Sequence, residues 1–217
     1  MENTFFSTEE FKRVPLIGIV RNLSFESIEQ ILPIYHSAGL GAIEITMNTP
    51  DADAMLRHAT RFYGDALQIG AGTVCNTDDL EKALQAGARF IVTPLLDEQV
   101  IKCCVQKGAP VFPGAFTPTE IYKAWSFGAE MVKIFPVSQF GAGYIKDIKA
   151  PLSQIRLLPT GGINLDNCID FLRAGASGLG VGSQLFDPRL IRDENWDGLA
   201  EHFASFARKL SSYYDSH

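Results

Sequence analysis

The stretch Glu-Met-Val-Lys-Ile-Phe-Pro, residues 130–136, has the composition of a buried β-strand with one lysine, Lys133, in its middle. Lysine is among the residues least often fully buried, because taking its ammonium out of water without a partner is costly. Burial lowers the pKa of such an amine, and a neutral amine is a nucleophile toward carbonyl carbons. The stretch therefore favours Lys133 as a Schiff-base nucleophile. The alternative is a lysine that reaches out of the strand end and binds a phosphate or carboxylate as a cation.

Strands of this kind alternate with helical patterns along the whole chain. Such alternation is typical of parallel strands joined by crossover helices, and eight units fit a (β/α)8 TIM barrel. An open doubly wound sheet is the alternative. A short N-terminal capping helix, with Ser7 as its N-cap, is expected before the first strand. The predicted strands are 16–20, 42–46, 67–70, 90–93, 110–112, 131–135, 155–158 and 178–181.

Composition limits the classes of protein that the chain can represent. The 217 residues are 46% hydrophobic and 20% charged, with no linker or charge block, so residues 1–217 are predicted to form a single (β/α)8 domain. A net charge of −6 leaves no basic surface for nucleic acid. The N-terminus has no signal pattern and no apolar run approaches the ~20 residues of a membrane helix, so a cytoplasmic protein is predicted. The four cysteines form no C-x-x-C pair and no metal-ligand constellation appears.

The predicted strand ends carry a chemically varied set of side chains. The active site of a (β/α)8 barrel lies at the C-terminal ends of its strands. Glu44, between two isoleucines, is either a proton shuttle for Lys133 or half of a structural ion pair with Arg21. The full set at these ends is Arg21, Glu44, Thr73, Pro94, Gly114, Lys133, Thr160 with Gly161 and Gly162, and Gly182 with Ser183.

Glycine turns follow the last two predicted strands, at Gly161-Gly162 and Gly182-Ser183. Loops at this place form a recurrent phosphate site in (β/α)8 barrels, because glycine lets backbone N–H groups approach an oxyanion. A third glycine turn, residues 70–73, would admit a substrate carboxylate with Thr73 as donor. Plain tight turns are the alternative for all three.

Together these motifs resemble those of the aldolases of 2-keto-3-deoxy-6-phosphogluconate and 4-hydroxy-2-oxoglutarate. The resemblance covers roughly residues 14–187. The motifs that carry it are IEITMNTP at 43–50, IGAGTV at 69–74, VTP at 92–94, KIFP at 133–136 and PTGG at 159–162.

The resemblance implies a class I aldolase in a homotrimeric (β/α)8 barrel, needing no metal or organic cofactor. It would cleave a 2-keto-3-deoxy-6-phospho sugar acid, a small phosphorylated keto acid, to pyruvate and D-glyceraldehyde 3-phosphate. By position, Lys133 matches the Schiff-base lysine and Glu44 the general acid/base. Thr73, Pro94, Phe135 and Thr160 match the pyruvate pocket, and Gly161, Gly162, Gly182 and Ser183 match the phosphate end.

The chain departs from the gluconate-type pattern at Asn48, where those enzymes usually have an arginine. Asn48, the IVRN segment ending in Asn22, and the segment FGAGYIK at 140–146 look more like the galactonate-specific branch, whereas Thr160 looks like the gluconate type. Arg21 then becomes the candidate cation for the substrate carboxylate or phosphate. We expect 2-keto-3-deoxy-6-phosphogluconate as the substrate, with the 6-phosphogalactonate epimer or 4-hydroxy-2-oxoglutarate as alternatives.

Two other functional classes remain open at this point. A phosphosugar epimerase or isomerase would use Glu44 as base and Lys133 as cation, without C–C cleavage. A sugar-phosphate binding or scaffold protein would use the same groups for binding alone.

Overall fold

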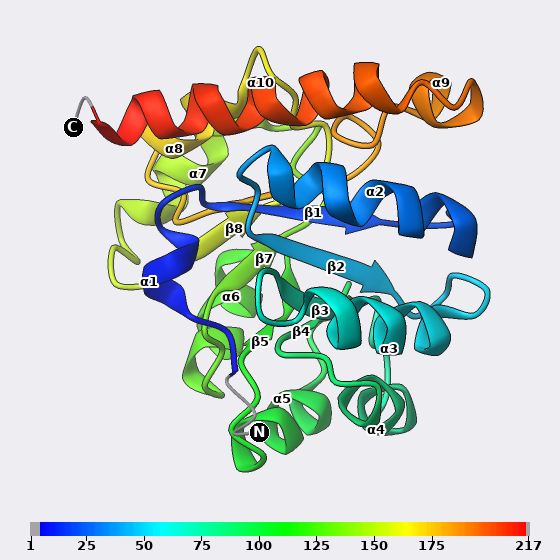
Figure 1. Ribbon diagram of the computed structural model, residues 1–217. Coiled ribbons are helices and arrows are strands. Elements are labelled where there is room, and N and C mark those ends of the chain that lie inside the picture. The colour runs from blue at the N-terminus through cyan, green and yellow to red at the C-terminus, as the bar shows by residue number, and fades with distance from the viewer. Residues whose placement is uncertain (1–4, 216–217) are drawn as a thin grey trace.

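The computed structural model describes residues 5–215, so residues 1–4, 216 and 217 of the predicted domain lie outside it; parallel strands form its centre and helices surround them (Figure 1). The strands are β1 (Leu16–Val20), β2 (Ala42–Thr46), β3 (Gln68–Gly72), β4 (Ile91–Val92), β5 (Val111–Phe112), β6 (Gly114–Ala115), β7 (Val132–Ile134), β8 (Leu157–Pro159) and β9 (Leu179–Val181). The helices are α1 (Thr8–Phe11), α2 (Phe25–Ser37), α3 (Ala52–Tyr63), α4 (Thr77–Gln85), α5 (Glu98–Gln106), α6 (Pro118–Ser126), α7 (Gly141–Lys149), α8 (Cys168–Arg173), α9 (Pro188–Arg192) and α10 (Trp196–Asp215).

The strands pair in parallel and in nearly sequential order, which gives a curled sheet. One sheet has the order β5-β4-β3-β2-β1-β9 and the other β6-β7-β8. An isolated parallel bridge joins Thr160, just after β8, to Gly180 in β9. A doubly wound sheet reverses its strand order at a switch point. The observed order has no such reversal, so the α/β prediction is confirmed and the doubly wound alternative does not fit.

The third predicted strand ends too early, and a short strand that was not predicted follows the fifth; both differences involve a residue that favours turns. The third strand was expected to end at Gly70 but continues to Gly72, which pairs with Thr46. The fifth was expected to end before Pro113-Gly114, yet pairing resumes as β6, where Gly114 pairs with Lys133. Pro113 interrupts the ladder because it has no N–H, although its carbonyl still accepts the Lys133 N–H at 2.9 Å.

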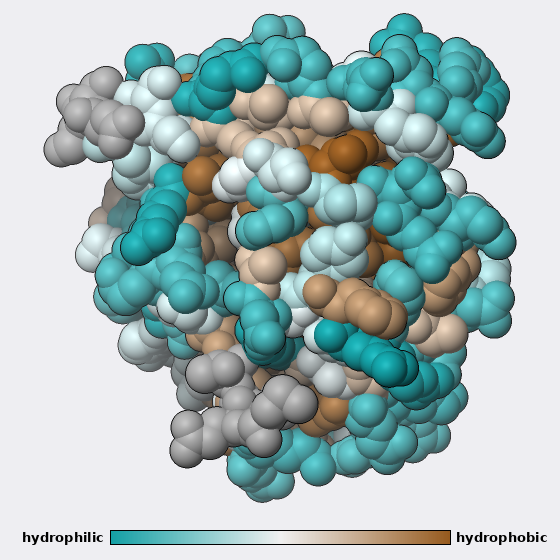
Figure 2. Space-filling view, in the orientation of Figure 1, coloured by the Kyte–Doolittle hydropathy of each residue, from teal (hydrophilic) through white to brown (hydrophobic). Residues whose placement is uncertain are grey.

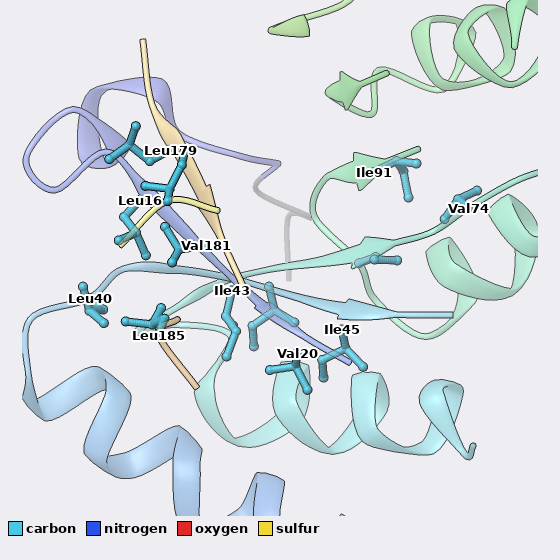
Figure 3. Close-up of a cluster of buried hydrophobic side chains, with 14 of the residues drawn as sticks. Leu16, Val20, Leu40, Ile43, Ile45, Val74, Ile91, Leu179, Val181 and Leu185 are labelled. Carbon is cyan, nitrogen blue, oxygen red and sulfur yellow. The ribbon is translucent and has the colours of Figure 1, made fainter. Parts of the chain in front are cut away.

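The core has two sides because side chains alternate along each strand. Side chains pointing outward, including Leu16, Val20, Ile43 and Ile45, form the apolar layer between strands and helices (Figure 3). Side chains on the inner side form a second cluster that Phe6 and Phe11 join from the N-terminal segment. The cluster consists of Phe6, Phe11, Ile17, Ala42, Phe90, Val92, Phe112, Met131 and Leu158.

The N-terminal helix is short but well anchored. The Ser7 side chain accepts the Glu10 N–H at 3.3 Å, which is the expected N-cap bond. The Phe6 ring centroid lies 5.1 Å from that of Phe11 and 5.2 Å from that of Phe90, so the segment packs against the inner cluster.

One buried tyrosine, Tyr35, joins β1, which leads to Arg21, to β2, which carries Glu44. The Tyr35 hydroxyl, from α2, accepts the Gly18 N–H at 3.1 Å and donates to the Ala42 carbonyl at 2.6 Å. A Cβ at position 18 would lie 2.6 Å from this hydroxyl, so the strand needs glycine there. The tyrosine therefore fixes the spacing of two strands that lead into the site.

The outer surface is mostly polar. On the face of α2, α3 and α10, hydrophilic side chains dominate and apolar atoms are visible mainly in the hollows between helices (Figure 2). Within the described part of the chain, no helix combines the length and the hydropathy needed to span a bilayer.

Candidate active site

A cavity of about 160 Å³ opens at the C-terminal ends of β1, β7, β8 and β9. Eight of its lining residues were predicted from the sequence. The lining consists of Ile19, Arg21, Lys133, Phe135, Thr160, Gly161, Gly162, Ile163, Gly180, Gly182, Ser183 and Gln184. A larger cavity of about 270 Å³ lies at the opposite strand ends, next to α1, and contains none of the predicted residues. Because the amine and the glycine turns meet only in the smaller cavity, that one is the candidate site.

Lys133 lies in the middle of β7 and is only 3% exposed. It pairs with Gly114 of β6 on one side and Leu158 of β8 on the other. Its Nζ lies 5.3 Å from the centroid of the Phe135 ring. Burial lowers the pKa of the Lys133 amine, and the negative charge of Glu44 opposes this effect. The lysine therefore points into the cavity as an amine with reduced proton affinity and does not reach out into water.

Glu44 lies in β2 and is 1% exposed. Its Oε1 is buried and has no hydrogen-bond partner within residues 5–215. Burial raises the pKa of this carboxyl group, whereas the positive charges of Lys133 and Arg21 favour its ionised form. No ion pair within 4.0 Å joins Glu44 to Arg21 in the described structure, so the structural ion-pair alternative does not hold.

Arg21 influences both titrating groups. Its positive charge adds to the lowering of the Lys133 pKa and also favours ionised Glu44. Its Nη2 donates to the Thr73 hydroxyl at 3.2 Å, and Thr73 has a left-handed φ of 56°. This bond leaves the hydroxyl proton of Thr73 available for another acceptor.

Glycines provide space for the side chains of the site. A Cβ at Gly72 would overlap Glu44 Oε1, and a Cβ at Gly180 would overlap the Thr160 hydroxyl. Gly72, the second glycine of the IGAGTV segment, is therefore a strand residue that accommodates the carboxyl group, not part of a turn that admits substrate.

The three other predicted site residues, Glu44, Thr73 and Pro94, do not line the cavity. A Cβ at Gly114 would overlap the Pro94 carbonyl, so Pro94 packs beside the strand partner of Lys133. Asn48 is exposed and also does not line the cavity.

The two predicted glycine turns lie together at one end of the cavity. Gly161 and Gly162 have φ values of 104° and 72°, which favour glycine, and Asn167 Nδ2 donates to the Gly162 carbonyl at 3.0 Å. Ser183 is exposed beside them. The sequence reading missed Ile163 and Gln184, which line the same end. Each directly follows a predicted turn residue, so extending both turns by one position would have found them.

The geometry defines a class of protein before any comparison. An amine whose pKa is lowered by burial, with a carboxyl group of raised pKa nearby, is suited to carbonyl chemistry through a Schiff base. Residues 8–201 match the family model described as KDPG and KHG aldolase, and the chain belongs to this family of aldolases.

Individual relatives point to two substrates. The chain is 37% identical to the 2-dehydro-3-deoxy-6-phosphogalactonate aldolase of Escherichia coli K12, over 80% of this chain and 85% of the relative. It is 33% identical to the 2-dehydro-3-deoxy-phosphogluconate aldolase of Haemophilus influenzae, over 87% of each chain.

Solved structures show the same fold. One described as native KDPGal has a TM-score of 0.86 at 33% identity and covers 93% of this chain and 96% of that chain. A KDPG aldolase from Legionella pneumophila, with pyruvate captured at low pH as a covalent carbinolamine intermediate, has a TM-score of 0.85 at 25% identity, over 92% of this chain and 97% of that chain.

Gly72→Ala tests whether this glycine accommodates the Glu44 carboxyl group. The new methyl group would overlap Glu44 Oε1 and lie 3.2 Å from Thr46 Cγ2. We expect the free energy of unfolding in urea to fall by about 1–3 kcal/mol, because overpacking displaces buried neighbours. In the control Gly143→Ala, no atom lies within 4 Å of the new methyl group, and stability should stay the same or rise. Equal stabilities of the two variants would contradict this explanation.

Proposed function

We propose that this chain is a class I aldolase that cleaves 2-keto-3-deoxy-6-phosphogluconate to pyruvate and D-glyceraldehyde 3-phosphate. The observation that carries the proposal is the burial of Lys133, at 3% exposure, in a cavity that also contains the glycine turns. Membership of a family of aldolases favours C–C cleavage over the epimerase and scaffold alternatives.

The proposed reaction starts when neutral Lys133 attacks the C2 ketone of the substrate. Loss of water gives an iminium, which withdraws electrons from the neighbouring bond. Glu44 takes the C4 hydroxyl proton, directly or through one water, as the C3–C4 bond breaks and the aldehyde leaves. The enamine left on Lys133 is protonated at C3, and hydrolysis then releases pyruvate and the free amine. The raised pKa of Glu44 makes its carboxylate a better proton acceptor than that of an ordinary glutamate.

The proposed binding groups form two sets, one for the carboxylate and pyruvate portion of the substrate and one for its phosphate. Arg21 and Thr73, joined by their hydrogen bond, would hold the substrate carboxylate, with Pro94, Phe135 and Thr160 around the pyruvate portion. Gly161, Gly162, Gly182 and Ser183 would bind the phosphate. Support comes from the free Thr73 proton and from the left-handed φ values at both glycines of the first turn.

The wider assignments go further than the individual contacts. We infer that the two parallel sheets belong to one eight-stranded (β/α)8 barrel, supported by the short break at Pro113 and by the Thr160–Gly180 bridge. In that barrel Phe6, Phe11 and α1 would close the N-terminal end. The single domain, the homotrimer and the cytoplasmic location stay predictions.

Borohydride reduction in the presence of pyruvate tests the Schiff base directly. Peptide mass analysis should find a reduced pyruvate adduct on Lys133, because its lowered pKa supplies neutral amine. The trapping rate should rise with pH and level off well below the ~10.4 of an ordinary lysine, since a lower pKa shifts the neutral form to lower pH. Lys133→Arg should give no adduct, and Lys146→Ala, at an exposed position in α7, should behave like the native chain. An unmodified Lys133 in the native chain would refute the class I assignment.

Glu44→Gln separates proton transfer from Schiff-base formation. The amide keeps the shape but cannot exchange the proton, so turnover should fall by ~10²–10⁴ in a coupled assay of pyruvate release. Pyruvate trapping should persist, because loss of the Glu44 charge lowers the pKa of Lys133 further. Glu29→Gln, on the exposed face of α2, is the control. Unchanged turnover in Glu44→Gln would remove this residue from the mechanism.

The relatives make the 6-phosphogalactonate epimer a second candidate substrate. Thr160 distinguishes the two possibilities because its hydroxyl lines the cavity and donates only a long bond, 3.3 Å, to the Leu158 carbonyl. We expect the native chain to cleave the gluconate epimer with the higher kcat/KM. Thr160→Val should shift the ratio of the two kcat/KM values about fivefold toward galactonate, since one hydrogen bond is worth about 1 kcal/mol. Both acids should be assayed side by side, and a ratio that Thr160→Val leaves unchanged would exclude Thr160 as the discriminating residue.

A further inference from the structure

The turn that follows β9 presents unpaired donors to the cavity. Gly182 accepts the N–H groups of Leu185 at 2.8 Å and Phe186 at 3.0 Å, which closes the turn. Ser183 and Gln184 lie between them and line the cavity. Neither their backbone N–H groups nor their side chains donate to an acceptor within residues 5–215. The turn is therefore closed on one side and offers free donors on the other.

A histidine on α10 holds this turn from the side away from the cavity. His202 Nε2 lies 2.8 Å from the Gln184 carbonyl oxygen. A carbonyl can only accept, so Nε2 carries the hydrogen and donates it. The His202 ring also meets the Phe206 ring edge-on, with centroids 5.3 Å apart and an interplanar angle of 85°. Phe206 is fully buried, so its contact fixes the position of the His202 ring, and the hydrogen bond of that ring fixes the turn after β9.

We propose that His202 is a positioning residue for the phosphate group of the substrate, a role that rests on the proposed function of this cavity. A turn that is already ordered loses little conformational freedom when its donors bind an anion, and preorganisation of this kind raises affinity. Without the His202 bond, the Gln184 carbonyl would turn to water and the donors of Ser183 and Gln184 would be less well ordered. His202 lies one residue beyond the part of the chain that matches the family model, which ends at residue 201.

The effect should be confined to the phosphate end of the substrate. Lys133 and Glu44 lie on β7 and β2, and no hydrogen bond links either side chain to the turn in the described structure. Pyruvate carries no phosphate and reports on the amine alone. Loss of the His202 hydrogen bond to the turn should therefore raise the KM for the phosphorylated acid and leave kcat and pyruvate trapping unchanged.

The test compares two donor-free variants with a rescue variant and a control. His202→Ala and His202→Phe should raise the KM for 2-keto-3-deoxy-6-phosphogluconate about tenfold, with kcat and half-saturation of borohydride trapping by pyruvate unchanged. His202→Phe keeps a ring against Phe206 and so separates the hydrogen bond from packing. His202→Gln can still donate from Nε2 and should restore the native KM. Ser205→Ala, which removes a hydroxyl bonded within α10, should match the native chain.

Three results would overturn the proposal: an unchanged KM in both donor-free variants, an equal increase in the KM and in the pyruvate concentration that half-saturates trapping, or no rescue by glutamine. Failure of the proposed function gives a different result, because the native chain itself would then trap no pyruvate on Lys133.

Discussion

Burial of an amine and a carboxyl group in one apolar interior is the constraint on which the rest of this structure depends. Each group alone would lose its charge, because desolvation disfavours the ammonium and the carboxylate alike. The neutral pair and the ion pair contain the same number of protons. In the proposed mechanism the pair therefore needs no proton from solvent to change between these two charge states, which suits a reaction that alternates between amine, iminium and enamine. The positive charge of Arg21 lowers the proton affinity of both groups, so it favours loss of one proton from the pair and the neutral amine and ionised carboxylate that the proposed mechanism uses as nucleophile and base.

The scaffold meets this constraint mainly by leaving space. Gly72 and Gly180 lack the Cβ atoms that would overlap the Glu44 carboxyl group and the Thr160 hydroxyl. Gly114, paired with Lys133, likewise leaves room for the Pro94 backbone. The strands β3, β6 and β9 thus each lack a side chain near the proposed catalytic groups, while large apolar residues such as Phe90 and Phe112 fill the inner cluster. The large apolar side chains that stabilise the interior therefore lie in one part of it, and the groups proposed to react lie in another.

Relatives of this chain are named for two different sugar-acid substrates, and the proposed site contains two kinds of position, buried strand residues and residues at the cavity wall. The Lys133 amine and the Glu44 carboxyl group, the proposed catalytic pair, lie on buried strands. Thr160 lies at the cavity wall, and Gln184 lies on a turn that depends on α10 for its position. Residues at such turns can change without altering the buried pair, so substrate choice can vary on an otherwise constant framework.

Sequence alone determined the alternation of strands and helices, the strand-end position of the functional residues and the unusual lysine in its apolar run. These features are local: periodicity, glycine stops and the cost of a buried charge are all readable from neighbouring residues. The ends of β3 and the break at Pro113 were misjudged because glycine and proline favour turns locally, whereas the pairing of Thr46 with Gly72 and of Lys133 with Gly114 extends the strands. Only the tertiary structure decided that Glu44 has no ion pair with Arg21, that Gly72 accommodates a carboxyl group, and that His202 reaches the turn after β9. Each of these depends on residues far apart in the chain that meet across strands or between a helix and a turn, and no local pattern in the sequence encodes such distances.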